Sequence, residues 1–285
     1  MPIKPSQIKL RDRTIGGSDV AALLNLSPFT SKEELRMEKS GLLTPRTETE
    51  AMSIGSLLED SLLNFASNEL GPLRRNQRRV HKTLPLACNI DALLNDSGDP
   101  VEAKVTGITG PVYGVWGDEG TDQVPEYVIA QCHAHMLVTD TSVCHVPALI
   151  GGRGIIMFRV ERSAVLSDYI EHAISEFWEC HVIQGVPCDG QAPPLDVLKR
   201  IRRVPAKVIP VPDSEVVEWL AAKQAWTLAM DKLDAAQATM IAHLGDAEAG
   251  VTAEHGAITY YEQTRKGYEV KASTYRVLRH RKDGL

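Results

Sequence analysis

A dense turn signal constrains the fold of this chain more than any other feature of its sequence. The run Asn95-Asp96-Ser97-Gly98-Asp99-Pro100 consists only of residues that favour turns. It separates two segments with the composition of β-strands, 78–94 and 101–105. The sequence therefore predicts strands on both sides of this turn, and with them a β-sheet in the first half of the chain.

Helical patterns alternate with strand patterns through residue 188. Apolar residues at helical spacing, together with residues that begin or end helices, predict one mixed α/β (α+β) domain over residues 1–188. The expected helices are about 18–24, 31–40, 53–70, 125–138 and 167–185, and further strands are expected near 143–150 and 155–160.

The chain changes character after residue 188. Segment 189–212 is rich in proline and basic residues and is predicted to be a linker or a segment that follows the surface. Residues 213–285 are predicted to form a C-terminal extension, with a long helix over 213–244 and a short hairpin within 251–270 that contains Tyr260 and Tyr261. Large residues and alanines each recur every seven residues on the long helix, which predicts close packing against another helix, in this chain or in a partner. The residues of this seam are Trp219, Ala222, Trp226, Ala229, Leu233, Ala236 and Met240.

Composition and charge narrow the class of protein. A formal net charge of −6 excludes a generally basic nucleic-acid-binding protein, although basic residues gather locally in 74–82, 199–207 and 276–282. The 5 cysteines are scattered, which argues against a disulfide framework and for a reducing compartment. We expect a cytoplasmic protein, because the opening residues lack the apolar segment of a signal peptide and no apolar run is long enough to span a membrane.

The stretch that carries chemistry is Asp91 followed by Glu102-Ala103-Lys104. Side chains alternate along a strand, so Glu102 and Lys104 share one face. If residue 94 lies opposite 101 and residue 91 opposite 104, Asp91 lies diagonal to Glu102 on that face, roughly 5–8 Å away. Two carboxylates bind a hard divalent cation, which activates water and neutralises a phosphoryl oxygen, while Lys104 stabilises the transition state. An ordinary ion pair on a surface hairpin is the alternative interpretation.

Three further features point in the same direction. Glu59 lies among leucines on a predicted helix, which is an unusual place for a carboxylate. Gln131 shares a helix face with Tyr127 and His135. Arg11 and Ser18 lie near the start of the first predicted helix, and helix N-termini bind phosphate. Taken singly, each feature also fits a solvated polar residue or a helix cap.

Several blocks of sequence occur in an order typical of one known family. They are IGGSDVAALLNLSPF, IGSLLED, NIDALL, VEAK, PEYVIAQCHAHM and EFWECHVIQGVP, and together they cover about residues 10–188. In these blocks the chain resembles the YqaJ-type viral recombinases, the lambda-exonuclease branch of the PD-(D/E)XK nucleases. The resemblance implies a restriction-endonuclease-like core, in which helices flank a mixed central sheet.

The resemblance also implies roles for individual residues. Glu59 matches the acidic residue of a helical block, Asp91 the metal-binding aspartate, Glu102 and Lys104 the ExK motif, and Gln131 the glutamine after the catalytic hairpin. On this basis Glu59, Asp91 and Glu102 are expected to bind the metal.

A second group of matches concerns the DNA end. Arg11 and Ser18 align with the family's pocket for a 5′-phosphate. Asn89 stands where better-known members can have a small hydroxyl residue that contributes to this pocket. Asn89 can still donate a hydrogen bond, but the departure weakens the pocket assignment. Residue 90 is Ile, so the proline of the superfamily motif is missing.

The activity implied by the resemblance is that of an exonuclease. Such enzymes are typically Mg²⁺-dependent, with Mn²⁺ as a substitute, and degrade one strand of linear double-stranded DNA from 5′ to 3′, which leaves 3′ overhangs. They work with a single-strand annealing protein in phage recombination, form ring-shaped homotrimers, and are found in a bacterial host or phage-infected cell without a membrane partner.

Three alternatives stay open on the sequence. The first is a PD-(D/E)XK endonuclease, since the motif serves both activities. The second is a non-catalytic DNA-binding protein in which residues 14–40 form a helix-turn-helix, although the second helix is a poor reader of bases. The third is a cysteine–histidine metal site built from Cys132, His133 and His135 with Cys144 and His145, although the cysteines lack a CxxC spacing.

Overall fold

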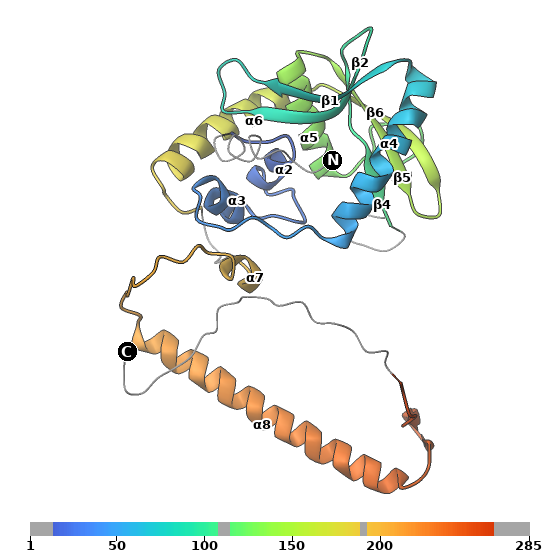
Figure 1. Cartoon of the computed structure of the whole chain (residues 1–285), viewed down its shortest axis with the longest axis vertical. Helices are drawn as coiled ribbons and strands as arrows, with labels where there is room; N and C mark the ends of the chain where they lie inside the picture. Colours follow the sequence, from blue (N-terminus) through green and yellow to red (C-terminus); the bar gives the residue numbers. More distant parts are fainter. Residues whose placement is uncertain (1–13, 108–114, 189–192, 265–285) are drawn as a thin grey trace. The chain divides into compact units, whose positions relative to one another are not determined.

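The structure is a computed structural model that describes residues 14–107, 115–188 and 193–264 (Figure 1). The chain divides into two compact units, Met1–Arg203 and Val204–Leu285. Among the described residues, no helix is both long and apolar enough to cross a membrane.

A mixed six-stranded sheet forms the centre of the first unit, as the alternating sequence patterns predict. Its order is β1-β2-β3-β5-β4, with β6 on the other edge of β5. The pairs β1–β2, β2–β3 and β5–β6 are antiparallel, whereas β3 and β4 run parallel to β5. The strands are β1 Leu73–Val80, β2 Ala87–Leu94, β3 Pro100–Val101, β4 Lys104–Thr106, β5 Val143–Ile150 and β6 Gly154–Glu161.

Helices flank this sheet (Figure 1). The core that joins α2, α5 and α6 to β2 includes Val20, Ile90 and Ile174, and a second core joins α5 to β5 and β6. Leu63 and Ala66 of α4 pack against Ala92 of β2 in a third core. The predicted fold class is therefore confirmed. The helices are α2 Asp19–Leu23, α3 Lys32–Lys39, α4 Glu50–Leu70, α5 Glu126–Thr139 and α6 Ala164–Glu176, which continues as the π-helical segment η2 Phe177–Ile183.

The predicted single strand 78–94 is wrong, because a turn over 81–86 divides it into β1 and β2. The ring Nδ1 of His81 accepts hydrogen bonds from the backbone N–H groups of Thr83 and Leu84, at 3.3 and 3.1 Å. Pro85 follows directly and has no N–H to offer a strand ladder. The basic residues 74–79 consequently lie on β1, an edge strand.

Two predicted helices begin earlier than expected. Helix α4 begins after Thr49, whose hydroxyl accepts a hydrogen bond from the N–H of Met52 at 3.3 Å. Helix α6 begins after Ser163, whose hydroxyl accepts from the N–H of Leu166 at 3.3 Å. In both cases a hydroxyl residue a few positions upstream of the predicted start caps the helix.

Part of the predicted linker packs against α3. Helix α7, Leu195–Leu198, contributes Val197 to a small core with Met37 and Leu43. Arg200 donates to Glu34 at 2.5 Å and to Glu38 at 2.7 Å. Residues 195–202 therefore belong to the first unit, and Arg200 is occupied by ion pairs rather than available to a ligand.

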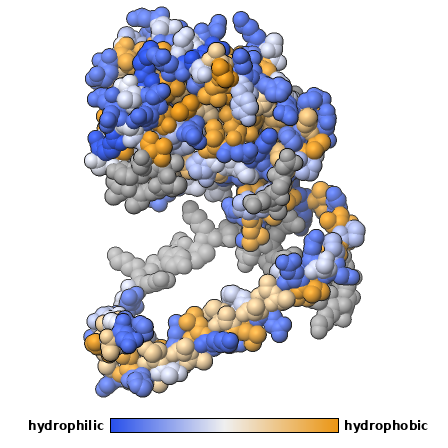
Figure 2. All heavy atoms as spheres, turned by 180° about the vertical axis from the view of Figure 1, so that it is seen from behind, coloured by the Kyte–Doolittle hydropathy of each residue, from blue (hydrophilic) through white to orange (hydrophobic). Residues whose placement is uncertain are grey.

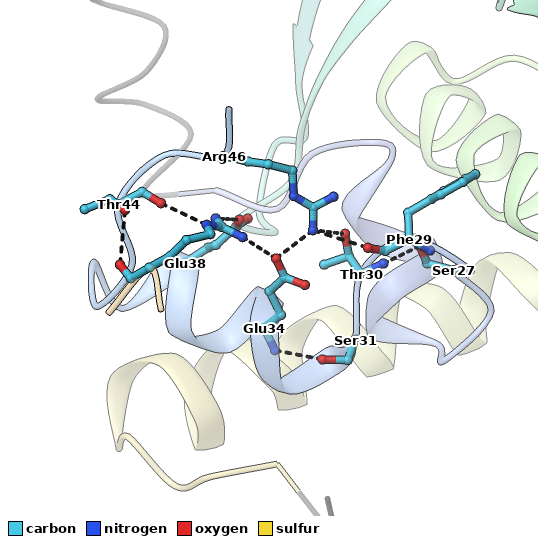
Figure 3. Close-up of polar contacts among 9 residues, drawn as sticks. Ser27, Phe29, Thr30, Ser31, Glu34, Glu38, Thr44 and Arg46 are labelled. Atoms are coloured by element: carbon cyan, nitrogen blue, oxygen red, sulfur yellow. Dashed lines mark hydrogen bonds and ion pairs between the residues drawn. The ribbon is translucent and has the colours of Figure 1, made fainter. Parts of the chain in front are cut away.

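Glu34 lies at the centre of the hydrogen bonds and ion pairs that surround α3 (Figure 3). The residue is 2% exposed, and its carboxylate accepts hydrogen bonds from Arg46 at 2.6 Å and from Arg200. The backbone N–H of Glu34 donates to the hydroxyl of Ser31, the N-cap of α3, at 3.1 Å. A buried carboxylate needs such partners, since burial of an unpaired charge is strongly unfavourable.

The second unit consists of one long helix and one hairpin. Helix α8 spans Asp213–Leu244 as predicted, and no residue of it is buried in the described part of the chain. Its seam is open to solvent: Trp226 is 66% exposed and Leu233 50%, and apolar side chains follow the helix in Figure 2. The hairpin pairs β7 Ala249–Thr252 with β8 Gly256–Thr259, so Tyr260 and Tyr261 follow the hairpin, contrary to prediction.

We expect a chain that ends at Pro212 to fold without the C-terminal extension. The reason is that no residue of α8 is buried in the described part of the chain and that the residues up to Arg203 form a compact unit of their own. Thermal unfolding followed by circular dichroism should give a cooperative transition within a few degrees of that of the full chain. A truncated protein that is insoluble or melts without cooperativity would contradict this division.

Candidate active site

The candidate site lies at the end of the pairing between β2 and β3. Ala92 pairs with Val101 and Leu93 with Pro100, so the predicted pairing of 94 with 101 is wrong by two residues. The loop closes earlier than predicted because Leu94 already bonds to Asp99, and Pro100 joins the strand. Continued by one residue, the observed register places Asp91 opposite Glu102 rather than diagonal to it.

The side chain of Asp91 takes over where the backbone ladder stops. The N–H of Glu102 donates to the carbonyl of His145 at 2.9 Å, as the parallel pairing of β3 with β5 requires. The next N–H, that of Ala103, donates to Oδ2 of Asp91 at 2.9 Å. β4 then pairs only with β5. The pairing of β2 with β3 therefore ends next to Asp91 and Glu102, which brings their two carboxylates to one place.

Glu102, Lys104 and Gln131 form a closed hydrogen-bonded triangle. Nζ of Lys104 donates to Oε1 of Glu102 at 2.6 Å and to Oε1 of Gln131 at 2.8 Å. Nε2 of Gln131, from α5, donates to the same Oε1 of Glu102 at 2.6 Å. Glu102 is 4% exposed and Gln131 9%. Each side chain is thus fixed by the other two, as a preorganised site requires.

Electrostatics separates the roles of the charged groups. Burial lowers the pKa of Lys104, but the charge and hydrogen bond of Glu102 more than offset it, so the net pKa lies above its usual value. Burial raises the pKa of Asp91 well above its usual range, and Glu102 raises it further, against the lowering effect of Lys104. Lys104 is therefore a fixed positive charge at neutral pH, and Asp91 is a carboxyl group short of positive partners.

Glu59 of α4 acts on this pair from a half-buried position. Burial raises its pKa, and the negative charge of Glu102 adds to the effect. Glu59 in turn raises the pKa of Asp91. The structure therefore places Glu59 within electrostatic reach of both carboxylates, although its place in a metal site stays a prediction.

The donor set fits a divalent cation through Asp91 and Glu102. In the described residues, no group of three or more His, Cys, Asp or Glu side chains is assembled to hold a metal ion. Oε2 of Glu102, however, is buried and has no hydrogen-bond partner among the described residues. Two hard carboxylate groups, one with an unpartnered oxygen and one with a raised pKa, are what Mg²⁺ or Mn²⁺ would neutralise.

The residues predicted for a 5′-phosphate pocket are less well defined. Arg11 lies outside the described residues. Ser18 is exposed at the start of α2 and makes no capping hydrogen bond in the described structure; Asp19 accepts from the N–H of Gly16 instead, at 2.8 Å. Asn89 is exposed on β2, two residues before Asp91, and its Oδ1 lies 3.4 Å from Nη1 of Arg78.

His135 is the residue whose place the sequence did not assign. It is 0% exposed, and its Nδ1 lies 3.5 Å from the free Oε2 of Glu102. Its position one helical turn after Gln131 was the available signal, but a helix face alone does not show which strand it meets.

The cysteines and histidines of the third alternative have structural contacts. His133 has Nδ1 2.9 Å from the carbonyl of Ile129, and its Nε2 accepts from the N–H of Ser163 at 3.0 Å. Cys132 and Cys144 are buried free thiols. Burial raises the pKa of Cys144 well above its usual value, which disfavours the thiolate that a metal would need.

We expect Asp91→Asn to stabilise the protein in the absence of divalent cations. The raised pKa means that the folded protein binds the Asp91 proton more tightly than the unfolded chain does. This proton stabilises the fold fully below the unfolded pKa of about 3.9, and the stabilisation is lost as the pH rises through the folded pKa. The advantage of the variant should therefore grow as the pH rises from about 4, at about 2–4 °C in melting temperature for each kcal/mol. Thermal melts in EDTA from pH 4.5 to 8 measure it, and a difference that does not change with pH would contradict the assignment.

The comparisons with known proteins agree with the sequence motifs. The profile of the YqaJ-like viral recombinase domain matches residues 8–142. The uncharacterized protein YqaJ of Bacillus subtilis is 29% identical over 194 residues, which cover 65% of this chain and 57% of that protein. The chain thus matches little more than half the length of this relative.

Two solved structures show a weaker likeness. An alkaline exonuclease from Laribacter hongkongensis has 18% identity and a TM-score of 0.48, covering 64% of this chain and 95% of that chain. A phage-related exonuclease from Haemophilus somnus 129PT has 12% identity and a TM-score of 0.48, covering 63% and 100%. The likeness to this family rests on the sequence, in which residues 8–142 match the YqaJ-like viral recombinase domain.

Proposed function

We propose that this protein is a divalent-cation-dependent deoxyribonuclease that digests linear double-stranded DNA from its ends. The observation that carries the proposal is the meeting of Asp91, Glu102, Lys104 and Gln131, from β2, the β3–β4 segment and α5, within one half-buried cluster. The family match supports the same function.

The residues of the cluster divide the work of phosphodiester hydrolysis. Asp91 and Glu102 would hold Mg²⁺, or Mn²⁺ in its place, and the ion supplies an activated water and charge neutralisation. Lys104 keeps its proton, because its pKa lies above the usual value, and so presents a positive charge to the oxygens of the scissile phosphate. Gln131 holds both Lys104 and Glu102 in place.

Finer features of the activity rest on family resemblance. These are digestion from 5′ to 3′, 3′ single-stranded overhangs, cooperation with a single-strand annealing protein, and a homotrimer around DNA. The basic residues of β1 support contact with the backbone of a duplex, since Arg74 is exposed and Arg78 lies beside Asn89.

A helix-turn-helix regulator is disfavoured by the contacts of α3. Arg36 is paired with Glu33 at 2.6 Å and Lys39 with Asp19 at 2.6 Å, and their side chains are only 11% and 6% exposed. A recognition helix needs such side chains free to reach base edges.

The proposed function is tested on three DNA substrates. Purified protein is incubated with end-labelled linear duplex, nicked circle and closed circle, in Mg²⁺ or in EDTA. Loss of label from the linear duplex in Mg²⁺, with the closed circle intact, supports the exonuclease. Cutting of the closed circle would show an endonuclease, and no cleavage of any substrate in Mg²⁺ or Mn²⁺ would contradict the proposal.

We expect a 5′-phosphorylated duplex to be digested faster than a 5′-hydroxyl duplex. A terminal phosphate carries about two negative charges that a guanidinium binds bidentately. Arg11→Ala should erase most of this preference by slowing digestion of the phosphorylated substrate, which a rate comparison on both substrates measures. A preference that survives in full would show that Arg11 is a surface charge.

A further inference from the structure

The unpartnered oxygen of Glu102 lies near a buried histidine that has no assigned role. Oε1 of Glu102 already accepts from Lys104 and Gln131, whereas Oε2 has no hydrogen-bond partner among the described residues. Nδ1 of His135 lies 3.5 Å from this Oε2. Both ring nitrogens of His135 are likewise buried and without a hydrogen-bond partner in the part of the chain that the structure describes.

The other side of the imidazole is closed by a glycine. A Cβ atom on Gly17, which precedes α2, would lie 2.5 Å from Nε2 and 2.8 Å from Cδ2 of His135. Real Cβ contacts are essentially never shorter than 3.0 Å, so any side chain at residue 17 would push the ring. Helices α2 and α5 pack together in the same core (Figure 1), and His135 is fully buried.

We propose that His135 is a positioning residue for Glu102: its Nδ1–H donates to Oε2, and Gly17 is glycine because a side chain would displace the imidazole. This inference rests on the proposed role of Glu102 as a cation ligand. It gives the IGGSD block a second role, because its second glycine, just before α2, leaves room for the imidazole that positions Glu102.

Chemistry favours this tautomer. Oε2 is the acceptor that faces Nδ1, so a proton on Nδ1 meets a carboxylate, and Nε2 is left with a lone pair rather than an unsatisfied N–H. The separation of 3.5 Å exceeds the 2.7–3.2 Å of a formed bond, but such contacts are often long before substrate binds. A carboxylate oxygen has two lone pairs, so Oε2 can accept from His135 and still bind a cation. Hydrogen bonds of this kind to ligating groups change metal affinity or activity about 10–100-fold.

Two substitutions of His135 separate positioning from packing. An asparagine amide reaches about as far as Nδ1, and a glutamine amide about as far as Nε2. We expect His135→Asn to bind Mn²⁺ within a few-fold of the wild type, and His135→Gln to bind it about 10–100-fold more weakly, by calorimetry on the protein without DNA. An equal loss of Mn²⁺ affinity in both variants, or no loss in either, would overturn the proposal. Thermal melts check that both variants are folded.

Two glycine substitutions give a matched pair. Gly17→Ala should weaken Mn²⁺ binding about as much as His135→Gln. Gly16→Ala is the control, since its Cβ would meet only the carboxylate of Asp19, at 3.1 Å. Adding His135→Asn to Gly17→Ala should recover part of the loss, because asparagine lacks Nε2, the nearest atom to the new methyl group. Strictly additive losses would contradict the contact.

A spectroscopic readout is independent of both metal and activity. Two-bond ¹H–¹⁵N correlations of ¹⁵N-histidine-labelled protein report the tautomer, and the His135 signal is the one absent from His135→Asn. We expect the Nδ1-protonated form, and an Nε2-protonated ring would overturn the proposal. A wild type that binds Mn²⁺ and shows this tautomer but leaves all DNA uncut would contradict the proposed function and leave the positioning role standing.

Discussion

Glu102→Gln should lower Mg²⁺-dependent DNA cleavage by about 10³–10⁵-fold while the protein stays folded. Glutamine keeps the size of the side chain but removes the negative charge that faces Lys104 and the proposed cation. It also turns one acceptor oxygen into a donor, opposite either the Lys104–Gln131 pair or His135. Initial rates on end-labelled linear duplex, with circular dichroism for the fold, measure the effect.

The control for this change is Glu161→Gln. Glu161 lies on β6 and forms an ion pair with Arg159, but its side chain is 69% exposed and far less constrained than that of Glu102. Loss of the Glu161 charge and its ion pair should change the cleavage rate little. Asp91→Asn should resemble Glu102→Gln, and the double variant should be hardly worse, because residues that act as a unit give non-additive losses. Substantial Mg²⁺-dependent cleavage by Glu102→Gln would exclude this site.

Local sequence patterns predicted the elements of the first unit well because local physics determines them. Helix α5 and strands β5 and β6 follow from periodicity and flanking breakers, and the ExK spacing placed Glu102 and Lys104 together. The family blocks were equally readable, because they are short contiguous strings.

The contacts that complete the site could not be predicted in this way. The register between β2 and β3 depends on how β3 fits between β2 and β5, where Val101 pairs with both Ala92 and His145. The ion pair of Glu34 with Arg200, and the approach of Gly17 to His135, likewise join segments that are far apart in sequence. A single sequence without an alignment carries no signal for such pairs, since many arrangements satisfy the same local pattern.

The Asp91 carboxyl illustrates why a site residue can look unfavourable in the fold. Burial raises its pKa and the carboxylates of Glu102 and Glu59 raise it further, whereas Lys104 and the N–H of Ala103 lower it. Proteins retain such costs where function requires them. Because Asp91 and Glu102 are the proposed cation ligands and Lys104 is the fixed charge, an experiment can separate the two roles.

Lys104→Ala should separate those roles most clearly. The substitution removes the positive charge that the structure places between Glu102 and Gln131, so cleavage should fall about 10²–10³-fold, as when a preorganised electrostatic donor is lost. Binding of Mn²⁺ should not weaken, because Asp91 and Glu102 remain and no longer share their charge with an ammonium group. Lys104→Arg should not restore the rate, since a planar fork does not replace a compact ammonium that serves two oxygens. Calorimetry on the protein without DNA, beside cleavage rates, measures both quantities. A Lys104→Ala protein that loses Mn²⁺ binding together with cleavage would show that Lys104 maintains the geometry of the carboxylates rather than stabilising charge on the phosphate.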